Sequence, residues 1–321
     1  EYFLVDRAYL GLRPDLLVAG RTLLGARAPK GQTLEDHYFG SIPARVQAFM
    51  EEVECELYLL GVSAKTRHNE VAPMQFELAP IFAEANLAAD HNQLVMQTFR
   101  RVAARHEFVV LLHEKPFAHV NGSGKHGNWS LQDSRGENLL EPGQNPQENL
   151  RFLVFLSATL LGVYRHASLL RASIASHGND FRLGANEAPP AIISVFLVDF
   201  LDRMCDGIAS GSVARMDAGQ AMLELGVARL PAILKDNTDR NRTSPFAFTG
   251  NKFEFRAVGS SANCAVPMAT LNAAAATALA DMTERLRKKL EGKPGHRDHA
   301  VADLLREVFK ETAAVRFEGN G

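Results

Sequence analysis

The sequence predicts an α+β fold, and three stretches indicate it. Residues 252–258 alternate with a period of two, so that Phe253 and Phe255 point to one face of a strand. Residues 83–106 carry apolar side chains at helical spacing, as in a long amphipathic helix. Residues 260–291 are rich in alanine, the best helix former. These local patterns leave the topology of the sheet open.

Length, charge and cysteine content limit the class of protein. The 321 residues suffice for one large domain or two ordinary ones, and no linker marks a boundary. A net charge of −2 argues against nucleic-acid binding. Cys55, Cys205 and Cys264 form no metal pattern and favour a reducing, cytosolic setting. No uncharged apolar run reaches about 18 residues, so no membrane span is expected.

The first part of the chain is expected to contain two strands and a helix before residue 65. Residues 1–6 have the aromatic and β-branched content of a strand. Residues 34–54 begin polar and aromatic and continue as a short amphipathic helix. Residues 56–62 are interpreted as a strand that leads through Gly61 into residues 65–80, a half-buried strand.

Helices dominate the expected elements after residue 80. The amphipathic helix at 83–106 is followed by an apolar strand at 108–113. A long, mostly apolar helix or helix pair is expected at 146–176, and it is followed by a loop at 176–190 that is dense in glycine, asparagine and charge. Loops of this kind commonly form lids and substrate contacts. The later segments are an apolar strand or helix at 191–201, a loop and helix at 209–228, and an amphipathic helix at 297–315.

Two carboxylates in residues 65–80 are the first candidate site. Glu70 and Glu77 lie in a segment with strand character, and buried carboxylates are costly unless a cation meets them. Their spacing of seven would place them on opposite faces of an unbroken strand, but Pro73 predicts a bulge that restores a common face. A metal ion is one interpretation. The alternative is two unrelated surface acids on an edge strand.

A glycine-rich stretch supplies the second candidate group. Gly122 and Gly124 would let the backbone approach a ligand closely. His126, Asn128 and Ser130 then alternate along the strand that follows. By itself, His126 is more often a structural or surface histidine than a ligand.

The polar face of the strand at 252–258 adds a further acid. Lys252, Glu254 and Arg256 share this face, which a solvated antiparallel strand would also explain. Three carboxylates and one imidazole form a ligand set suited to Mg²⁺ or Mn²⁺: Glu70, Glu77, His126 and Glu254. Three arginines offer planar cations for carboxylate or phosphate: Arg182, Arg242 and Arg256. Metal ions and arginines together are typical of phosphoryl transfer.

Six ordered segments together resemble the glutamine synthetases, specifically the type III form. The segments are residues 1–6, 34–43, 69–80, 121–126, 182–190, and 241–246 with 253–256. The resemblance implies that residues 1–321 are a fragment of the catalytic domain, with a curved, largely antiparallel sheet backed by helices. It places the N-terminal β-grasp domain and a C-terminal remainder outside this chain. Because that domain completes each active site in the family, activity of the isolated chain is left open.

The resemblance also implies roles for individual residues. One metal ion would be held by Glu1, Glu70 and Glu77, and a second by His126 and Glu254. The glutamate substrate would be bound by Asn121, Gly122 and Arg182. The transferring phosphate would meet Arg242 and Arg256, and Glu187 would be the flap acid that takes a proton from ammonium. The nucleotide would contact Phe82, Asn128, Ser130 and Lys252. Asn128 differs from the histidine usual in other types of the family.

The reaction implied by the resemblance is ATP-dependent amidation of L-glutamate by ammonium through γ-glutamyl phosphate. It implies two or three Mg²⁺ or Mn²⁺ ions per site, ATP as co-substrate, a cytoplasmic location, and a homo-oligomer of stacked hexameric rings without nucleic-acid or membrane partners. Two alternatives are kept. A γ-glutamyl-amine ligase would use another amine. The second alternative is a catalytically silent homologue, which an absence of divalent-metal binding by the longer parent chain would favour.

Overall fold

The computed structural model describes residues 1–211, 222–223, 233–234, 243–291 and 297–317. It divides the chain into two compact units. The first unit comprises Glu1–Gly127, Ser173–Ala191 and Arg256–Met268, and the second comprises Asn128–Ala172, Ile192–Phe255 and Ala269–Gly321. Arg242 and most of the segment expected at 209–228 lie outside the described residues. The α+β class is confirmed, whereas one catalytic domain over residues 1–321 stays a prediction.

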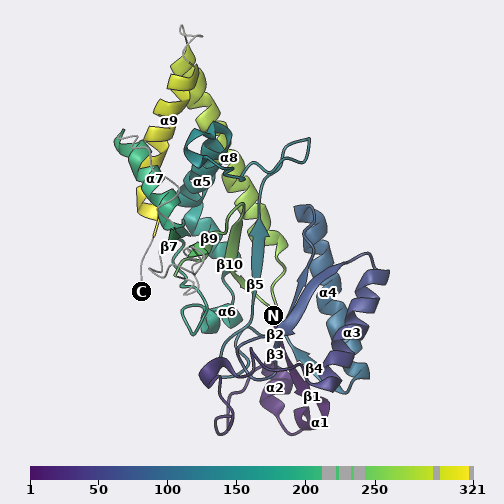
Figure 1. Cartoon of the computed structure of the whole chain (residues 1–321). Helices are drawn as coiled ribbons and strands as arrows, with labels where there is room; N and C mark the ends of the chain where they lie inside the picture. Colours follow the sequence, from purple (N-terminus) through teal and green to yellow (C-terminus); the bar gives the residue numbers. More distant parts are fainter. Residues whose placement is uncertain (212–221, 224–232, 235–242, 292–296, 318–321) are drawn as a thin grey trace, which may run out of the picture. The chain divides into compact units, whose positions relative to one another are not determined.

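Figure 1 labels the described α-helices and most of the strands. The strands are β1 (Tyr2–Asp6), β2 (Ala64–Asn69), β3 (Gln75–Pro80), β4 (Phe108–Leu111), β5 (Gly124–Trp129), β6 (Val195–Phe196), β7 (Met222–Leu223), β8 (Ile233–Leu234), β9 (Phe246–Phe248) and β10 (Phe253–Gly259). The α-helices are α1 (Arg7–Leu10), α2 (Pro14–Ala19), α3 (Ala44–Leu59), α4 (Ala85–Arg105), α5 (Leu150–Ile174), α6 (His177–Arg182), α7 (Asp199–Ser210), α8 (Ala265–Leu290) and α9 (Arg297–Glu311). Short 3₁₀ turns are η1 (Thr33–Glu35), η2 (Pro146–Glu148) and η4 (Ala313–Val315).

The first unit is built on an antiparallel sheet with the strand order β2-β3-β1-β4. Alternation along β1 sends Tyr2 and Leu4 into one apolar core, shared with α3 and α4, and Phe3 into another on the opposite face. The rings of Tyr2 and Phe99 are 4.4 Å apart between centroids. Figure 1 shows α3 and α4 beside this sheet. Both faces of β1 are therefore buried, which explains its continuous apolar sequence.

The strand expected at residues 56–62 is wrong, because α3 continues to Leu59 and β2 begins only at Ala64. The buried side chains of α3 recur at helical spacing: Val46, Phe49, Met50, Val53 and Leu57. Leu57 continues this face. Its burial in the core that α3 shares with Tyr2 and Leu4 therefore holds residues 56–59 in a helix. In a short apolar run, the pattern of side chains alone does not distinguish a strand from a helix.

The bulge expected at Pro73 is also wrong. The chain turns there, and β2 and β3 form an antiparallel hairpin. The amide of Glu70 donates to the carbonyl of Gln75 at 2.9 Å, which closes the turn. Pro73 lies inside the turn, because it has no N–H to donate to a ladder. Turn geometry, rather than an extra residue in one strand, thus sets the relation between Glu70 and Glu77.

The second sheet has the order β5-β10-β9-β6, in which β6 and β9 pair in parallel. Phe253 of β10 lies opposite Phe248 of β9, and its ring stacks on that of Phe246 with centroids 4.5 Å apart. The period of two predicted for residues 252–258 is confirmed by the burial of Phe253 and Phe255. The opposite face is not simply solvated, because Arg256 is only 5% exposed.

Helices α5, α8 and α9 of the second unit share an apolar core. Gly162 of α5 permits their close packing, since a Cβ there would lie 2.8 Å from the carbonyl oxygen of Ala274 in α8. Among the described residues, α5 is the helix long and apolar enough to cross a membrane by length and composition, and 56% of its most apolar window is buried in the fold. Core helices of globular proteins pass the same test.

The remaining expected helices are confirmed with shifted ends. Helix α4 spans most of residues 83–106, and α5, α8 and α9 lie within the predicted 146–176, 260–291 and 297–315. The loop expected at 176–190 begins as helix α6, whose first turn is capped by the Ser176 side chain accepting from the Asn179 amide.

Candidate active site

The β2–β3 hairpin brings two predicted metal ligands together with a third side chain. His68 lies directly opposite Glu77 in the hairpin register, and Glu70 follows β2. One possible ligand atom from each of these three residues lies within 4.8 Å of the others. The distance from His68 Nδ1 to Glu70 Oε1 is 3.8 Å, as is that from His68 Nε2 to Glu77 Oε2.

His68 is absent from the residues that the sequence predicts as ligands. A signal for it was present, because side chains two positions apart on a strand share a face, and His68 precedes Glu70 by two. Its position opposite Glu77 depends on the hairpin register, which the expected bulge at Pro73 obscured.

The predicted ligands Glu1 and His126 belong to the same unit as this cluster. The Glu1 carboxylate accepts a hydrogen bond from the Gly124 amide at 2.7 Å, which ties it to the start of β5. Burial raises the pKa of Glu70 and the negative charge of Glu1 adds to this rise, whereas an electrostatic interaction with His126 acts to lower the pKa of Glu77. Four of the five predicted metal ligands therefore lie in the first unit, where Glu70 interacts with Glu1 and Glu77, and Glu77 also interacts with His126.

Burial and the neighbouring acids oppose ionisation of Glu70 when no cation is present. Burial raises the pKa of Glu70 to about 9, and the charges of Glu1 and Glu77 act in the same direction. Burial also acts to raise the pKa of Glu77, whereas the hydrogen bond with Glu70 acts to lower it. Burial therefore disfavours the ionised form of Glu70. Crowded carboxylates with an adjacent imidazole fit a divalent metal ion.

Binding of Mn²⁺ at pH 7 is expected to release about one proton, because Glu70 must ionise to become a ligand. The raised pKa also means that the folded, metal-free protein keeps a proton that the unfolded chain has lost. Stability of the metal-free protein should therefore fall as pH rises from 4.5 towards about 9. Calorimetric titrations in buffers of different ionisation enthalpy measure the proton release. Equal binding enthalpies in all buffers would contradict it.

The predicted ligand Glu254 lies on β10 in the second unit and is partly buried. Its predicted pairing with His126 stays a prediction, as does the role of Arg242, which is outside the described residues. Arg256 is buried on the same strand, within the first unit.

One of the predicted glutamate-binding residues, Asn121, contacts the predicted flap acid Glu187. Asn121 is 2% exposed, and its Nδ2 donates to Glu187 Oε2 at 3.3 Å. At Gly122 a Cβ would lie 2.5 Å from the carbonyl oxygen of Glu114, so only glycine fits. The Gly122 carbonyl accepts from the side chain of Gln75 at 2.9 Å, which links this loop to the metal-site hairpin.

Arg182 is buried at 2% exposure and bonds to the backbone of β10. Its Nη2 donates to the carbonyl of Arg256 at 3.0 Å, and its Nη1 lies 3.4 Å from the carbonyl of Val258 and from Asn179 Oδ1. Space for the guanidinium exists because residue 124 is glycine, where a Cβ would lie 2.0 Å from Nη2. Arg182 thus fastens α6 to β10, and its predicted contact with substrate stays a prediction.

A buried lysine holds the loop that carries Glu187. Lys115 is 8% exposed, and its ammonium group donates to the carbonyl of Val120 and, at 2.8 Å, to Asn186 Oδ1. Asn186 has a left-handed backbone with φ of 55°. The loop is closed further by the Gly184 amide, which donates to the Pro189 carbonyl at 2.9 Å.

Replacing Lys115 by methionine is expected to lower the free energy of unfolding by about 2 kcal/mol, because two oxygen acceptors lose their buried donor. Amide hydrogen exchange in residues 184–189 should also accelerate, because the loop loses its attachment. The matched control is Lys125→Met, which removes another buried ammonium group that donates to the Ala262 carbonyl at 2.7 Å. If both variants changed exchange in the loop equally, the attachment would be excluded.

The predicted nucleotide contacts fall in both units. Phe82 is 91% exposed in the first unit. Asn128, Ser130 and Lys252 belong to the second, where the Ser130 hydroxyl donates to Asn138 Oδ1 at 2.6 Å. Their joint role stays a prediction.

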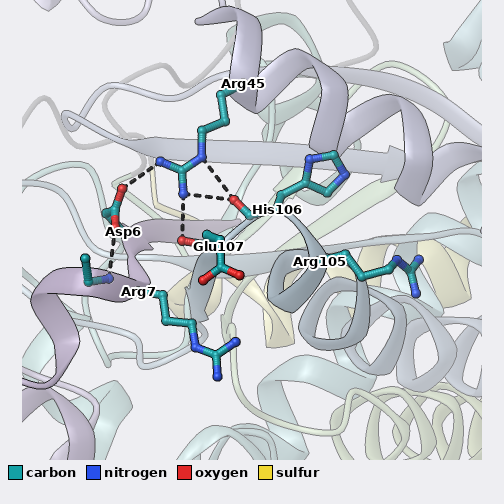
Figure 2. Close-up of a pocket in the computed structure, with 7 residues that line it drawn as sticks. Asp6, Arg7, Arg45, Arg105, His106 and Glu107 are labelled. Atoms are coloured by element: carbon teal, nitrogen blue, oxygen red, sulfur yellow. Dashed lines mark hydrogen bonds and ion pairs between the residues drawn. The ribbon is translucent and has the colours of Figure 1, made fainter.

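A hollow of about 580 Å³ lies at the end of β1, and none of the predicted site residues lines it. Figure 2 shows its lining side chains. Arg45 lines the hollow and donates to Asp6 at 2.6 Å and to the carbonyls of His106 and Glu107 at 2.8 and 2.6 Å. These bonds use the guanidinium to join α3 to the turn between α4 and β4. We therefore assign the hollow a structural role rather than a ligand-binding one.

The comparisons with known proteins agree with the resemblance found in the sequence. The family model for the glutamine synthetase catalytic domain matches residues 1–194. The chain is 55% identical to a glutamine synthetase of Bacteroides fragilis, covering 100% of this chain and 44% of that protein. It is 50% identical to a type-3 glutamine synthetase of Dictyostelium discoideum, covering 100% of this chain and 43% of that protein. The chain thus spans less than half the length of these relatives.

Two solved structures share the fold. A Plasmodium falciparum glutamine synthetase matches with a TM-score of 0.58 at 15% identity, covering 83% of this chain and 44% of that one. A structure described as apo GmaS without ligand matches with a TM-score of 0.57 at 20% identity, covering 99% and 68%. The family match over residues 1–194 and the identities of 50% and 55% over the whole of this chain show that it belongs to the glutamine synthetase family.

Proposed function

We propose that the full-length protein joins ammonia to the γ-carboxylate of L-glutamate through γ-glutamyl phosphate, converting ATP to ADP and phosphate and forming L-glutamine. The observation that carries this proposal is the meeting of His68, Glu70 and Glu77 on one hairpin, with Glu70 buried. Relatives that are named glutamine synthetases and match the whole chain support it. Oxygen-rich clusters of this kind hold the ions that accompany nucleotide phosphates.

The metal-binding part of the proposal assigns two or three divalent ions, Mg²⁺ or Mn²⁺, to each site. Bound ions would neutralise negative charge on the phosphates of ATP. Glu1, Glu70 and Glu77 are proposed to hold one ion. His126 is proposed to hold a second together with Glu254.

The remaining residues are proposed to bind, orient and exclude water. Arg242 and Arg256 would neutralise charge on the transferring phosphoryl group. Glu187 would take a proton from ammonium, and the hydrogen bond from Asn121 orients its carboxylate for that task. The loop held by Lys115 would shield γ-glutamyl phosphate from water, which otherwise hydrolyses it.

The partners and location proposed for the full-length protein follow from its family. They are L-glutamate, ammonium and ATP as substrates, and a homo-oligomer of stacked hexameric rings in the cytoplasm. Light scattering of the full-length protein measures the assembly. A stable monomer with full activity would contradict the proposed rings.

The test of the function is phosphate release from ATP by the full-length protein with Mg²⁺ or Mn²⁺, while glutamate, ammonium and other amines are added or omitted in turn. Release that requires both glutamate and ammonium, with equimolar glutamine, is the expected result. Release with another amine but little with ammonium would assign the protein to the γ-glutamyl-amine ligases. A folded, metal-binding protein without release would be a silent homologue.

A further inference from the structure

The hydrogen bond made by His68 determines which of its ring nitrogens can accept a metal ion. Nδ1 lies 2.9 Å from the carbonyl oxygen of Asn69. Because a carbonyl oxygen can only accept, Nδ1 carries the hydrogen and donates it. In the neutral ring, Nε2 then keeps a lone pair. Metal-binding histidines are commonly oriented in this way, by donating the second N–H to a backbone carbonyl.

The lone pair on Nε2 lies on the side of the ring near Glu77. Nε2 and Glu77 Oε2 are 3.8 Å apart, which is too long for a hydrogen bond. Two bonds of about 2.1 Å to a single ion can span up to about 4 Å, so one ion could contact both atoms. The edge of the neighbouring Tyr38 ring packs against the imidazole, with centroids 6.1 Å apart, and helps to fix its orientation.

We infer that His68 is a further ligand of the ion held by Glu70 and Glu77, binding through Nε2, and that it makes this site prefer Mn²⁺ over Mg²⁺. Imidazole nitrogen is a softer donor than carboxylate oxygen, and Mg²⁺ selects oxygen more strictly than transition-metal ions do. The inference deepens the proposed function, on which it rests for the presence of a metal, because that function leaves the choice of ion open.

Two substitutions separate ligation by His68 from its structural hydrogen bond. His68→Asn keeps an N–H near the place of Nδ1, where it can still donate to the Asn69 carbonyl, but leaves no atom near the place of Nε2. His68→Gln can instead bring an amide oxygen close to the place of Nε2. The first variant removes the proposed ligand, and the second replaces nitrogen by a hard oxygen donor.

Metal affinities are measured by calorimetric titration of the full-length protein with Mn²⁺ and with Mg²⁺. His68→Asn is expected to weaken Mn²⁺ binding roughly tenfold or more, in line with the loss of a group that holds a metal. His68→Gln should lose Mn²⁺ affinity while keeping Mg²⁺ affinity, so the preference for Mn²⁺ falls about tenfold. An unchanged preference in both folded variants would overturn the inference.

Electron spin echo spectroscopy of bound Mn²⁺ detects imidazole nitrogen directly, independently of turnover. Because His126 is a predicted ligand of another ion, the experiment uses His126→Asn as its background. Nitrogen modulation should persist in that variant and disappear in the double variant with His68→Asn. If the nitrogen modulation stayed undiminished in the double variant, His68 would be excluded as its source.

The two proposals fail in different ways. Modulation from His68 without glutamine formation would refute the proposed function and leave the inference standing. Glutamine formation without any effect of His68→Asn on modulation or ion preference would refute the inference alone.

Discussion

Replacing Glu70 by alanine is expected to reduce glutamine formation by the full-length protein at least about a thousandfold, since several kcal/mol of charge stabilisation depends on the bound ion. Glu70 is 5% exposed, and its Oε1 is directed at the ligand cluster, 3.8 Å from His68 Nδ1. Without it, one of the two hairpin carboxylates that flank His68 is lost. Phosphate release measures the activity, and calorimetric titration with Mn²⁺ measures the loss of the ion.

Although Glu70→Ala should lose activity, its metal-free form is not expected to lose stability. Because the pKa of Glu70 is raised by burial to about 9, the carboxyl group destabilises the metal-free fold at pH 8. Metal-free Glu70→Ala should therefore unfold at a temperature no lower than the parent. Glu51→Ala, at an exposed position of α3, serves as the control and should leave activity unchanged. Normal turnover in Glu70→Ala would refute the metal assignment.

Gly124→Ala is expected to lower the free energy of unfolding by about 3 kcal/mol or more, because overpacking here also displaces a buried charge. The new Cβ would lie 2.0 Å from Arg182 Nη2 and 2.2 Å from its Cζ. Arg182 would have to give up its 3.0 Å bond to the Arg256 carbonyl. Denaturant unfolding of the parent and the variant measures the change.

A double-mutant cycle tests the steric cause of that loss. In an Arg182→Ala background, Gly124→Ala should cost far less, because the guanidinium no longer occupies the space. Gly11→Ala is the control: Gly11 has a φ of −63° and no atom within 4 Å of the added Cβ, so stability should stay within about 0.5 kcal/mol. Equal costs of Gly124→Ala in both backgrounds would point to a cause other than Arg182.

Most regular elements were predictable because their signals are local. The period of two at Phe253 and Phe255 and the helical spacing in residues 83–106 both describe how neighbouring side chains share a face. The error at residues 56–62 arose where such a signal is weakest, in a short apolar run. Packing of Leu57 against the core of the first unit stabilises this segment as a helix.

The acids of the candidate site were recognisable, but their arrangement was not. Glu70 and Glu77 stood out as carboxylates in a segment of strand character, whereas His68 gained its significance only from lying opposite Glu77. A strand register changes the face of every side chain when it shifts by one residue, and the turn around Pro73 sets that register. The resemblance in sequence could name ligands but not this pairing.

The sequence by itself determined the α+β class, the family, most helices and the candidate acids and arginines of the site, because periodicity, residue type and motif are properties of the linear sequence. Only the tertiary structure decided which groups meet. It placed His68 beside Glu70 and Glu77, and it brought Lys115 to Asn186 across 71 positions of sequence. Such contacts depend on turn geometry and on burial in a shared core, and both are properties of the folded chain as a whole.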